Sequence, residues 1–254
     1  MFLGVIRFLI GLSVGSFLNV LSLRYEAGGR LFRPDVLRGR SFCRGCKKTL
    51  AWYELIPLAS FILQFGRCRS CRAPLTWQYP IVELISGFAL AFIPMLAQPA
   101  LIWVPVVLTL VLITLIDMRL MVIPDQLNLL IGVLGATLII SSGASLMDIL
   151  WNNAAGAVFG AALLGLIVVI TRGRGMGIGD VKLAAALGLL FGVREVLLII
   201  SAAFVLGGLV GFFMVVFNRK SLKMAVPFGP FLSLAAVLVL LFGQIPIRWF
   251  YGLL

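Results

Sequence analysis

The chain has 254 residues, of which 62% are hydrophobic and only 12% are charged. This composition excludes an ordinary soluble protein, so most of the chain must lie in lipid or against itself inside lipid. The net charge of +12 does not predict a nucleic-acid partner, because 11 of the 21 cations fall within residues 24–72, a polar segment between apolar ones. The segment has no interleaving of basic and aromatic residues. The sequence has no histidine, which excludes catalysis by Ser-His-Asp or Cys-His groups.

Taken in chain order, the apolar stretches predict about eight transmembrane helices. The first, residues 2–23, is long enough to span and lacks a convincing cleavage site, so we interpret it as a retained helix. Residues 24–79 are polar, and their one apolar patch, 55–65, is too short to cross a bilayer. The remaining spans are predicted at residues 80–97, 101–116, 126–141, 149–170, 181–191, 196–217 and 225–242, of which 101–116 and 181–191 are short.

The distribution of cations predicts the orientation of these spans. Lys and Arg gather in alternate loops, at residues 24–79, 119, 172–182 and 219–223, and such loops stay in the cytoplasm. We therefore expect the N-terminus outside. The predicted fold is an all-α polytopic membrane protein with a small cytosolic zinc-ribbon-like module between helices 1 and 2. Its predicted domains are the first helix (1–23), the module (24–79) and a membrane-embedded domain (80–254).

The module contains all four cysteines of the chain, in two Cys-x-x-Cys pairs separated by 21 residues. Two such pairs typically supply four thiolates to a tetrahedral Zn²⁺ ion. Two disulfides are the alternative, which the reducing cytosol disfavours. A site with four protein ligands leaves no open position, so we expect a structural metal bound by Cys43, Cys46, Cys68 and Cys71.

Three aspartates lie at predicted helix ends, where lipid makes a charge costly and a function is expected. Asp180 follows Gly177 and Gly179 in the run Gly-Ile-Gly-Asp, where the glycines allow non-helical backbone and close approach of an extended peptide. Its alternative role is to cap the next helix. Two carboxylates that share one proton can activate a water and protonate a leaving group, as in aspartic proteases.

The partner of Asp180 is either Asp117 or Asp125. Asp125 follows Pro124 and could simply cap its helix. Asp117 lies at a helix C-terminus, where the helix dipole disfavours a carboxylate, so a structural role explains it poorly. The residues alone therefore favour Asp117 without deciding.

Several motifs follow one another along the chain: Gly-Ser-Phe-Leu-Asn-Val at 15–20, both cysteine pairs with Trp-Tyr-Glu-Leu-Ile-Pro at 52–57, Tyr-Pro-Ile-Val-Glu-Leu at 79–84, Ile-Asp at 116–117, Pro-Asp at 124–125, Gly-Ile-Gly-Asp-Val-Lys at 177–182 and Pro-Phe-Gly-Pro-Phe at 227–231. Together they resemble the type IV prepilin peptidases. The order of these motifs is that of the family, and they cover nearly the whole chain.

The resemblance implies a bifunctional enzyme of the bacterial inner membrane that serves pilus biogenesis or type II secretion. Such enzymes cleave the basic leader from prepilins and pseudopilins, ahead of a hydrophobic helix, and N-methylate the new N-terminus. The resemblance assigns catalysis to Asp117 and Asp180 and leaves Asp125, Gly177, Gly179 and Lys182 as supporting residues. It also implies S-adenosylmethionine as methyl donor and links methylation to the cysteine-bearing half. No residue of a Rossmann-type nucleotide loop identifies the donor's site.

Two further polar residues lie inside predicted spans. Glu83 could serve the methylation or substrate site, or pair with an arginine of the module. Asn19 could hydrogen-bond a neighbouring helix.

Three other functions compete with the peptidase. A proton- or ion-coupled transporter would need carboxylates near the middle of the bilayer and inverted repeats, and neither is evident. A zinc-bearing scaffold for secretion machinery would leave Asp117 and the Gly-Ile-Gly-Asp run unexplained. An enzyme that retains only one of the two activities stays open.

Overall fold

The computed structural model describes residues 2–243 except 32, 38, 98, 144 and 219–225. The predicted loop at 219–223 and the start of the last predicted span at 225 lie outside these residues. Among the described residues there are helices and two isolated β-bridges but no strand, so the all-α prediction is confirmed. The chain divides into two compact units, Met1–Leu112 and Ile113–Leu254, which are described separately below.

In the described part of the chain, six helical segments are long and apolar enough to cross a membrane: Phe2–Arg24, Gln78–Leu96, Ala100–Leu120, Asp125–Ser142, Trp151–Ile170 and Val193–Phe217. The predicted spans 181–191 and 225–242 correspond to two helices of only 14 residues, α9 (Ile178–Phe191) and α11 (Gly229–Phe242). At 1.5 Å per residue each is about 21 Å long, less than the roughly 30 Å of a hydrocarbon core. A count of eight full spans is therefore not confirmed.

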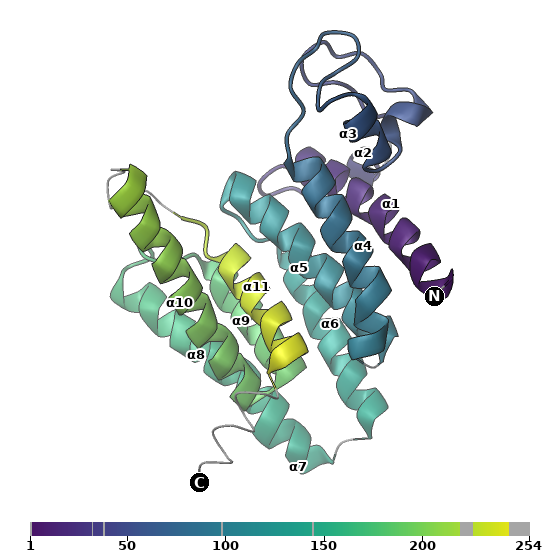
Figure 1. Ribbon diagram of the computed structural model, residues 1–254. Coiled ribbons are helices and arrows are strands. Elements are labelled where there is room, and N and C mark those ends of the chain that lie inside the picture. The colour runs from purple at the N-terminus through teal and green to yellow at the C-terminus, as the bar shows by residue number, and fades with distance from the viewer. Residues whose placement is uncertain are drawn as a thin grey trace. The chain divides into compact units, whose positions relative to one another are not determined.

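In the first unit, α1 (Phe2–Arg24) packs closely against α4 (Gln78–Leu96). Glycines make this possible, since a Cβ on Gly11 would lie 2.5 Å from the Ser86 carbonyl oxygen and one on Gly15 would lie 2.8 Å from the Glu83 Cα. Close approach through small residues is the usual way for helices to associate in lipid. The pair supports the cysteine module at one end (Figure 1).

The cysteine module consists of loops and short helices: α2 (Pro34–Leu37), the 3₁₀ turn η1 (Trp52–Leu55) and α3 (Ala59–Leu63). The apolar patch at 55–65 forms no span, as predicted, because only α3 within it is α-helical. Helix α5 (Ala100–Leu120) follows α4 and ends in the second unit.

In the second unit, α9 is the central helix. It packs against α6 (Asp125–Ser142), α8 (Ala155–Ile170), α10 (Val193–Asn218) and α11. Helix α8 follows the short α7 (Leu146–Asp148) and the π-helical segment η2 (Ile149–Ala154). These neighbours surround α9, so a helix too short to span is shielded by protein, which is where polar groups at membrane depth are tolerated.

Glycines also bring α8 and α9 together. A Cβ on Gly156 would lie 2.6 Å from the Gly188 carbonyl oxygen, and one on Gly160 would lie 2.7 Å from the Ala184 carbonyl oxygen. Gly156 and Gly160 thus allow the close packing of helices that small residues provide in membranes.

Candidate active site and metal centre

The two cysteine pairs lie on two turns, residues 42–49 and 67–74, that have the same local structure. An isolated β-bridge closes each turn, and the N–H of its first cysteine donates to the carbonyl five residues later over 2.9 Å. The residue after each second cysteine, Lys47 or Arg72, has a left-handed φ of 60° or 55°. Because the two turns match in this way, each presents its sulfurs and amide N–H groups in the same manner.

The four cysteines form one cluster. Their sulfur atoms all lie within 4.8 Å of one another, and all four cysteines are free thiols, so the disulfide alternative is wrong. The Sγ atoms of Cys43 and Cys71 are 3.7 Å apart, close to the roughly 3.8 Å that tetrahedral geometry with 2.3 Å Zn–S bonds requires. The cluster therefore has the donor set and spacing for a metal ion.

The thiols of this cluster differ in acidity. The backbone N–H groups of Cys46 and then Gly45 lower the pKa of Cys43 to about 6, although burial opposes them. The N–H of Ala73 also lowers the pKa of Cys71, but loss of water contact and the neighbouring thiols outweigh it and raise that pKa to about 11. One thiolate thus forms easily and disfavours the next, which is the electrostatic problem that a bound cation removes.

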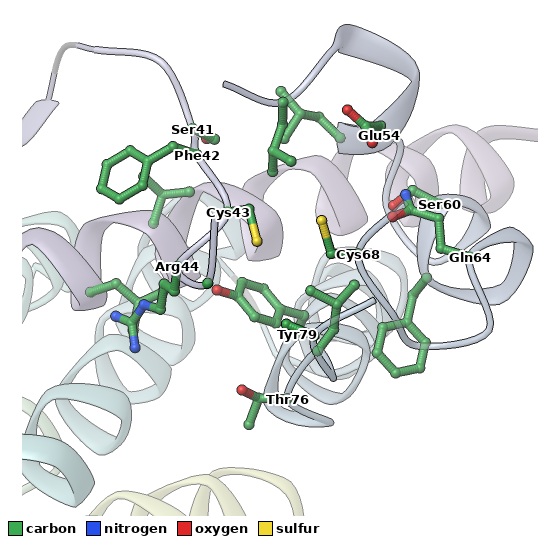
Figure 2. Close-up of a pocket in the computed structure, with 18 of the residues that line it drawn as sticks. Ser41, Phe42, Cys43, Arg44, Glu54, Ser60, Gln64, Cys68, Thr76 and Tyr79 are labelled. Carbon is green, nitrogen blue, oxygen red and sulfur yellow. The ribbon is translucent and has the colours of Figure 1, made fainter. Parts of the chain in front are cut away.

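Cys43 and Cys68 of the cysteine cluster line a cavity of about 230 Å³ within the first unit. Figure 2 shows the side chains of Cys43, Cys68 and Tyr79 directed toward its centre, with Arg44 and Glu54 at opposite sides. Glu54 is buried, and its Oε2 accepts a hydrogen bond from the Ala51 N–H over 2.9 Å. The cavity therefore combines aromatic surface, a cation and a buried carboxylate.

Two intramembrane polar residues of the first unit, Asn19 and Glu83, have hydrogen-bond partners within the unit. The Asn19 side chain donates to the Gly15 and Tyr79 carbonyls and accepts from the Gln78 Nε2, so the expected bond to a neighbouring helix is confirmed. The Glu83 carboxylate accepts from the Leu58 N–H over 2.8 Å and interacts with the Ser16 hydroxyl. Among the described residues these contacts take the place of the arginine partner that was one of the two alternatives for Glu83.

In the second unit, Asp117 lies in the last turn of α5 and is 4% exposed. Its Oδ2 accepts a hydrogen bond from the Gly229 N–H over 3.0 Å. Gly229 is the first residue of α11, and the N-terminus of a helix carries partial positive charge with unpaired N–H groups. The start of α11 therefore offsets the unfavourable dipole that Asp117 meets at the end of its own helix.

Asp180 is the third residue of α9 and is 8% exposed. Its Oδ2 accepts from the Gly177 N–H over 3.2 Å, and its own N–H donates to the Gly177 carbonyl at the same distance. Gly177, not Asp180, is therefore the N-cap residue of α9, and Asp180 contributes to the cap from the third helical position through its Oδ2. The Asp117 and Asp180 carboxylates lie near enough to interact electrostatically, so the structure brings these two predicted residues together.

Ile123 fills the space between the two aspartate-bearing ends. It is buried in the loop after α5, and a Cβ on Gly179 would lie 3.1 Å from the Ile123 Cβ. A Cβ on Gly229 would lie 3.2 Å from the Ile123 Cδ1. The sequence predicted that an extended peptide approaches the glycines closely, and the segment that lies against Gly179 in the structure is the chain's own loop at Ile123. Gly177 has the predicted non-helical backbone, with φ −83° and ψ 152°.

Asp125 is placed differently from the other two aspartates. It is the first residue of α6 and is exposed, and both of its carboxylate oxygens lie 2.8 Å from the Lys182 Nζ. Pro124, not Asp125, occupies the N-cap position of α6. Asp125 instead joins α6 to α9 through its ion pair with Lys182. The structure thereby accounts for Lys182, for which the sequence offered only its place in a motif.

Comparison with known proteins places the chain in a family. Residues 104–212 match the type IV leader peptidase family, and residues 9–96 match the bacterial peptidase A24 N-terminal domain. A prepilin leader peptidase/N-methyltransferase of Aeromonas hydrophila is 32% identical, and the alignment covers 96% of this chain and 92% of the relative. A protein of the same name from Bacillus subtilis is 31% identical, and the alignment covers 94% of this chain and 94% of the relative. Another from Stutzerimonas stutzeri is also 31% identical, with 92% of this chain and 89% of the relative covered. The chain belongs to the type IV leader peptidase family. No solved structure matches it.

The two matched regions of this leader peptidase homologue follow its structure. The N-terminal match covers α1 apart from the first residues of that helix, the whole cysteine module, and α4. The longer match contains Asp117 and Asp180. Gly229, which holds Asp117, lies beyond both matches. The sequence of the Pro-Phe-Gly-Pro-Phe run did not predict its role, because only the fold shows that a residue 112 positions later donates to Asp117.

Proposed function

We propose that this chain is a membrane aspartic endopeptidase that removes the leader of type IV prepilins or pseudopilins, with Asp117 and Asp180 as its catalytic pair. The observation that carries the proposal is that two buried carboxylates lie near enough to interact electrostatically, each with its Oδ2 hydrogen-bonded to a backbone N–H. The names of the relatives, prepilin leader peptidase/N-methyltransferase, support the substrate class.

In this mechanism the ionised carboxylate takes a proton from a water molecule as the water attacks the scissile carbonyl carbon. The protonated carboxylate donates to the leaving amine, so the C–N bond breaks without free acid or base. The N–H of Gly229 orients Asp117, and the N–H of Gly177 orients Asp180. Both bonds fix one oxygen of each carboxylate and leave Oδ1 for the reacting groups.

The decisive experiment incubates the purified protein with a prepilin that carries a basic leader and a hydrophobic helix, and determines the N-terminus of the product by mass spectrometry. Cleavage at the leader boundary by the wild type, with no cleavage by Asp117→Asn, supports the proposal. Full cleavage by both Asp117→Asn and Asp180→Asn would refute the carboxylate mechanism.

We also propose that Cys43, Cys46, Cys68 and Cys71 hold a structural Zn²⁺ ion. The four thiols close the coordination sphere, and the ion would tie the two turns of the module together. We further propose that the helices lie in the bacterial inner membrane, with the N-terminus outside and with the module and both aspartates on the cytoplasmic side. Support for this orientation comes from the cations of residues 24–72.

Methylation of the new N-terminus would follow cleavage, with S-adenosylmethionine as donor. The amine nitrogen bonds to the donor's methyl carbon as the carbon–sulfur bond breaks, which leaves a neutral thioether and releases a proton. We propose that the cavity beside the cysteines holds this donor, because its lining supplies a carboxylate, a cation and aromatic rings. Glu54 would face its cationic groups, Arg44 its carboxylate, and the ring of Phe42 or Tyr79 its purine.

Equilibrium dialysis with labelled S-adenosylmethionine tests this site without any turnover. Glu54→Gln keeps an acceptor for the Ala51 N–H but removes the charge, so we expect binding to weaken by about tenfold. Asp117→Asn is the matched control and should bind the donor as the wild type does. Equal binding by the wild type and Glu54→Gln would place the donor elsewhere.

A further inference from the structure

Asn128 and Ser233 are buried polar residues that have no function in the mechanism above. They are 6% and 3% exposed. Among the described residues, neither the Asn128 amide oxygen and nitrogen nor the Ser233 hydroxyl has a hydrogen-bond partner. A buried polar group without a partner costs about 1–3 kcal/mol, so native proteins keep few of them without a reason.

Asn128 lies about as far from the loop between α5 and α6 as Asp117 does. It is three residues after the start of α6, and Asp117 is three residues before the end of α5, so each is about 4.5 Å along its helix from the shared loop. Asn128 also shares a face with Gly135, seven residues later. That face meets α9, because a Cβ on Gly135 would lie 3.0 Å from the Leu190 Cα. Asn128 is therefore on the side of α6 that faces the helix of Asp180.

Ser233 is related to Asp117 through α11. It lies four residues after Gly229, on the same face and one turn, about 6 Å, farther along the helix. The Gly229 face is the one that meets Asp117, since a Cβ there would lie 2.6 Å from the Asp117 Oδ2. Two helices that border the aspartates thus each present one unpartnered polar side chain.

We propose that Asn128 and Ser233 are substrate-positioning residues that hydrogen-bond the substrate main chain on the hydrophobic-helix side of the cleaved bond. This inference rests on the proposed peptidase function. A helical substrate must unwind before it can be cut, and each freed N–H and C=O group in an apolar setting needs a new partner. An Asn amide offers both donors and an acceptor, which matches a peptide group, and a Ser hydroxyl offers one of each.

The first test compares cleavage and stability in Asn128→Leu and Ser233→Ala. We expect kcat/KM to fall by about tenfold in each variant, the effect of about one lost hydrogen bond in an apolar site. Thermal stability should not fall, because neither substitution breaks a bond within the protein. Asn128→Thr, which restores a hydroxyl, should recover part of the loss.

Ser86 supplies the matched control. It is a buried hydroxyl that also has no partner, but it lies in α4 of the first unit. Ser86→Ala should therefore cleave as the wild type does. A loss of activity in Ser86→Ala equal to that in Ser233→Ala would mean that any buried hydroxyl affects the enzyme, and the assignment would fall.

A second test changes the substrate, so it does not depend on the folding of a variant. Prepilin peptides are prepared with an ester in place of one peptide bond at each of the first few positions after the cut, which removes a single N–H. With the wild type, at least one ester should lower kcat/KM by about tenfold. With Asn128→Leu or Ser233→Ala, that same ester should cause little further loss, because the partner is already gone.

The outcomes separate this inference from the proposed function. A wild type that cleaves no prepilin refutes both. A wild type that cleaves, together with variants that cleave equally well, refutes only the positioning role and leaves a buried water as the partner of these groups. Ester and protein effects that multiply independently would also refute it.

Discussion

Adding one methyl group at Gly229 should displace a carboxylate of the proposed catalytic pair while the fold stays intact. In Gly229→Ala the new Cβ would lie 2.6 Å from the Asp117 Oδ2 and 3.2 Å from its Cγ, whereas an ordinary contact begins at 3.4 Å. The carboxylate must therefore move by about 0.8 Å. A displacement of about 1 Å in a catalytic group costs about 100-fold in rate, so we expect kcat for prepilin cleavage to fall by one to two orders of magnitude with little change in KM.

The stability of the same variant should change much less than its rate. Overpacking typically costs about 1–3 kcal/mol, and the N–H of residue 229 remains. Gly208 in α10 provides the control, because a Cβ there would meet nothing within 4 Å. Steady-state cleavage and thermal unfolding of Gly229→Ala, Gly208→Ala and the wild type give the comparison. A kcat for Gly229→Ala within threefold of that of Gly208→Ala would show that the bond to Asp117 does not matter for catalysis.

The remaining predictions concern the acidic residues and the cluster of four cysteines. Asp117→Asn and Asp180→Asn should each lower the rate of cleavage by about a thousandfold or more in protein that still folds. Asp125→Asn should retain most activity. Loss of activity in Asp125→Asn, with near-normal cleavage by Asp117→Asn, would show that Asp117 is not the partner of Asp180. Lys182→Met should change the free energy of unfolding by less than about 1 kcal/mol, because exposed ion pairs contribute little, and a larger change in chemical denaturation would show that the pair to Asp125 is structural. Metal analysis should find about one zinc per wild-type chain and little in Cys43→Ser; an absence of zinc from the wild type would defeat the assignment.

The helices could be predicted from the sequence because lipid demands long apolar runs, and each predicted span that the structure describes is helical. The lengths were less predictable. Residues 101–116 gave a short span in the sequence, yet α5 extends from Ala100 to Leu120, because its polar last turn with Asp117 and Arg119 remains helical. Residues 181–191 did give a short helix, α9. Hydropathy reports the surroundings of each residue and not the end of its hydrogen-bonded helix.

The cluster of four cysteines was predictable for a different reason. Both pairs of ligands are local in sequence, and only the meeting of the two turns needs the tertiary fold. The matching φ values of Lys47 and Arg72 were not evident, since neither residue type favours a left-handed conformation. The fold imposes that conformation so that each turn can direct two sulfurs to one point.

The hydrogen-bond partner of Asp117 could not be predicted from the local sequence. A carboxylate at a helix C-terminus is unfavourable by the dipole rule, and that anomaly was the physical reason to suspect a function. The structure resolves the anomaly with a second helix: α11 begins at the carboxylate, and its first residue lacks the side chain that would block the approach. The local rule was therefore correct about the cost but said nothing about the compensation, which comes from 112 residues away. Asn128 and Ser233 present the same kind of anomaly without its resolution, since the cost of burial is evident in the described residues and the compensating partner is not. If compensation at Asp117 is supplied by the chain, the corresponding compensation at these two residues is best sought in the substrate, whose unwound main chain has the complementary need.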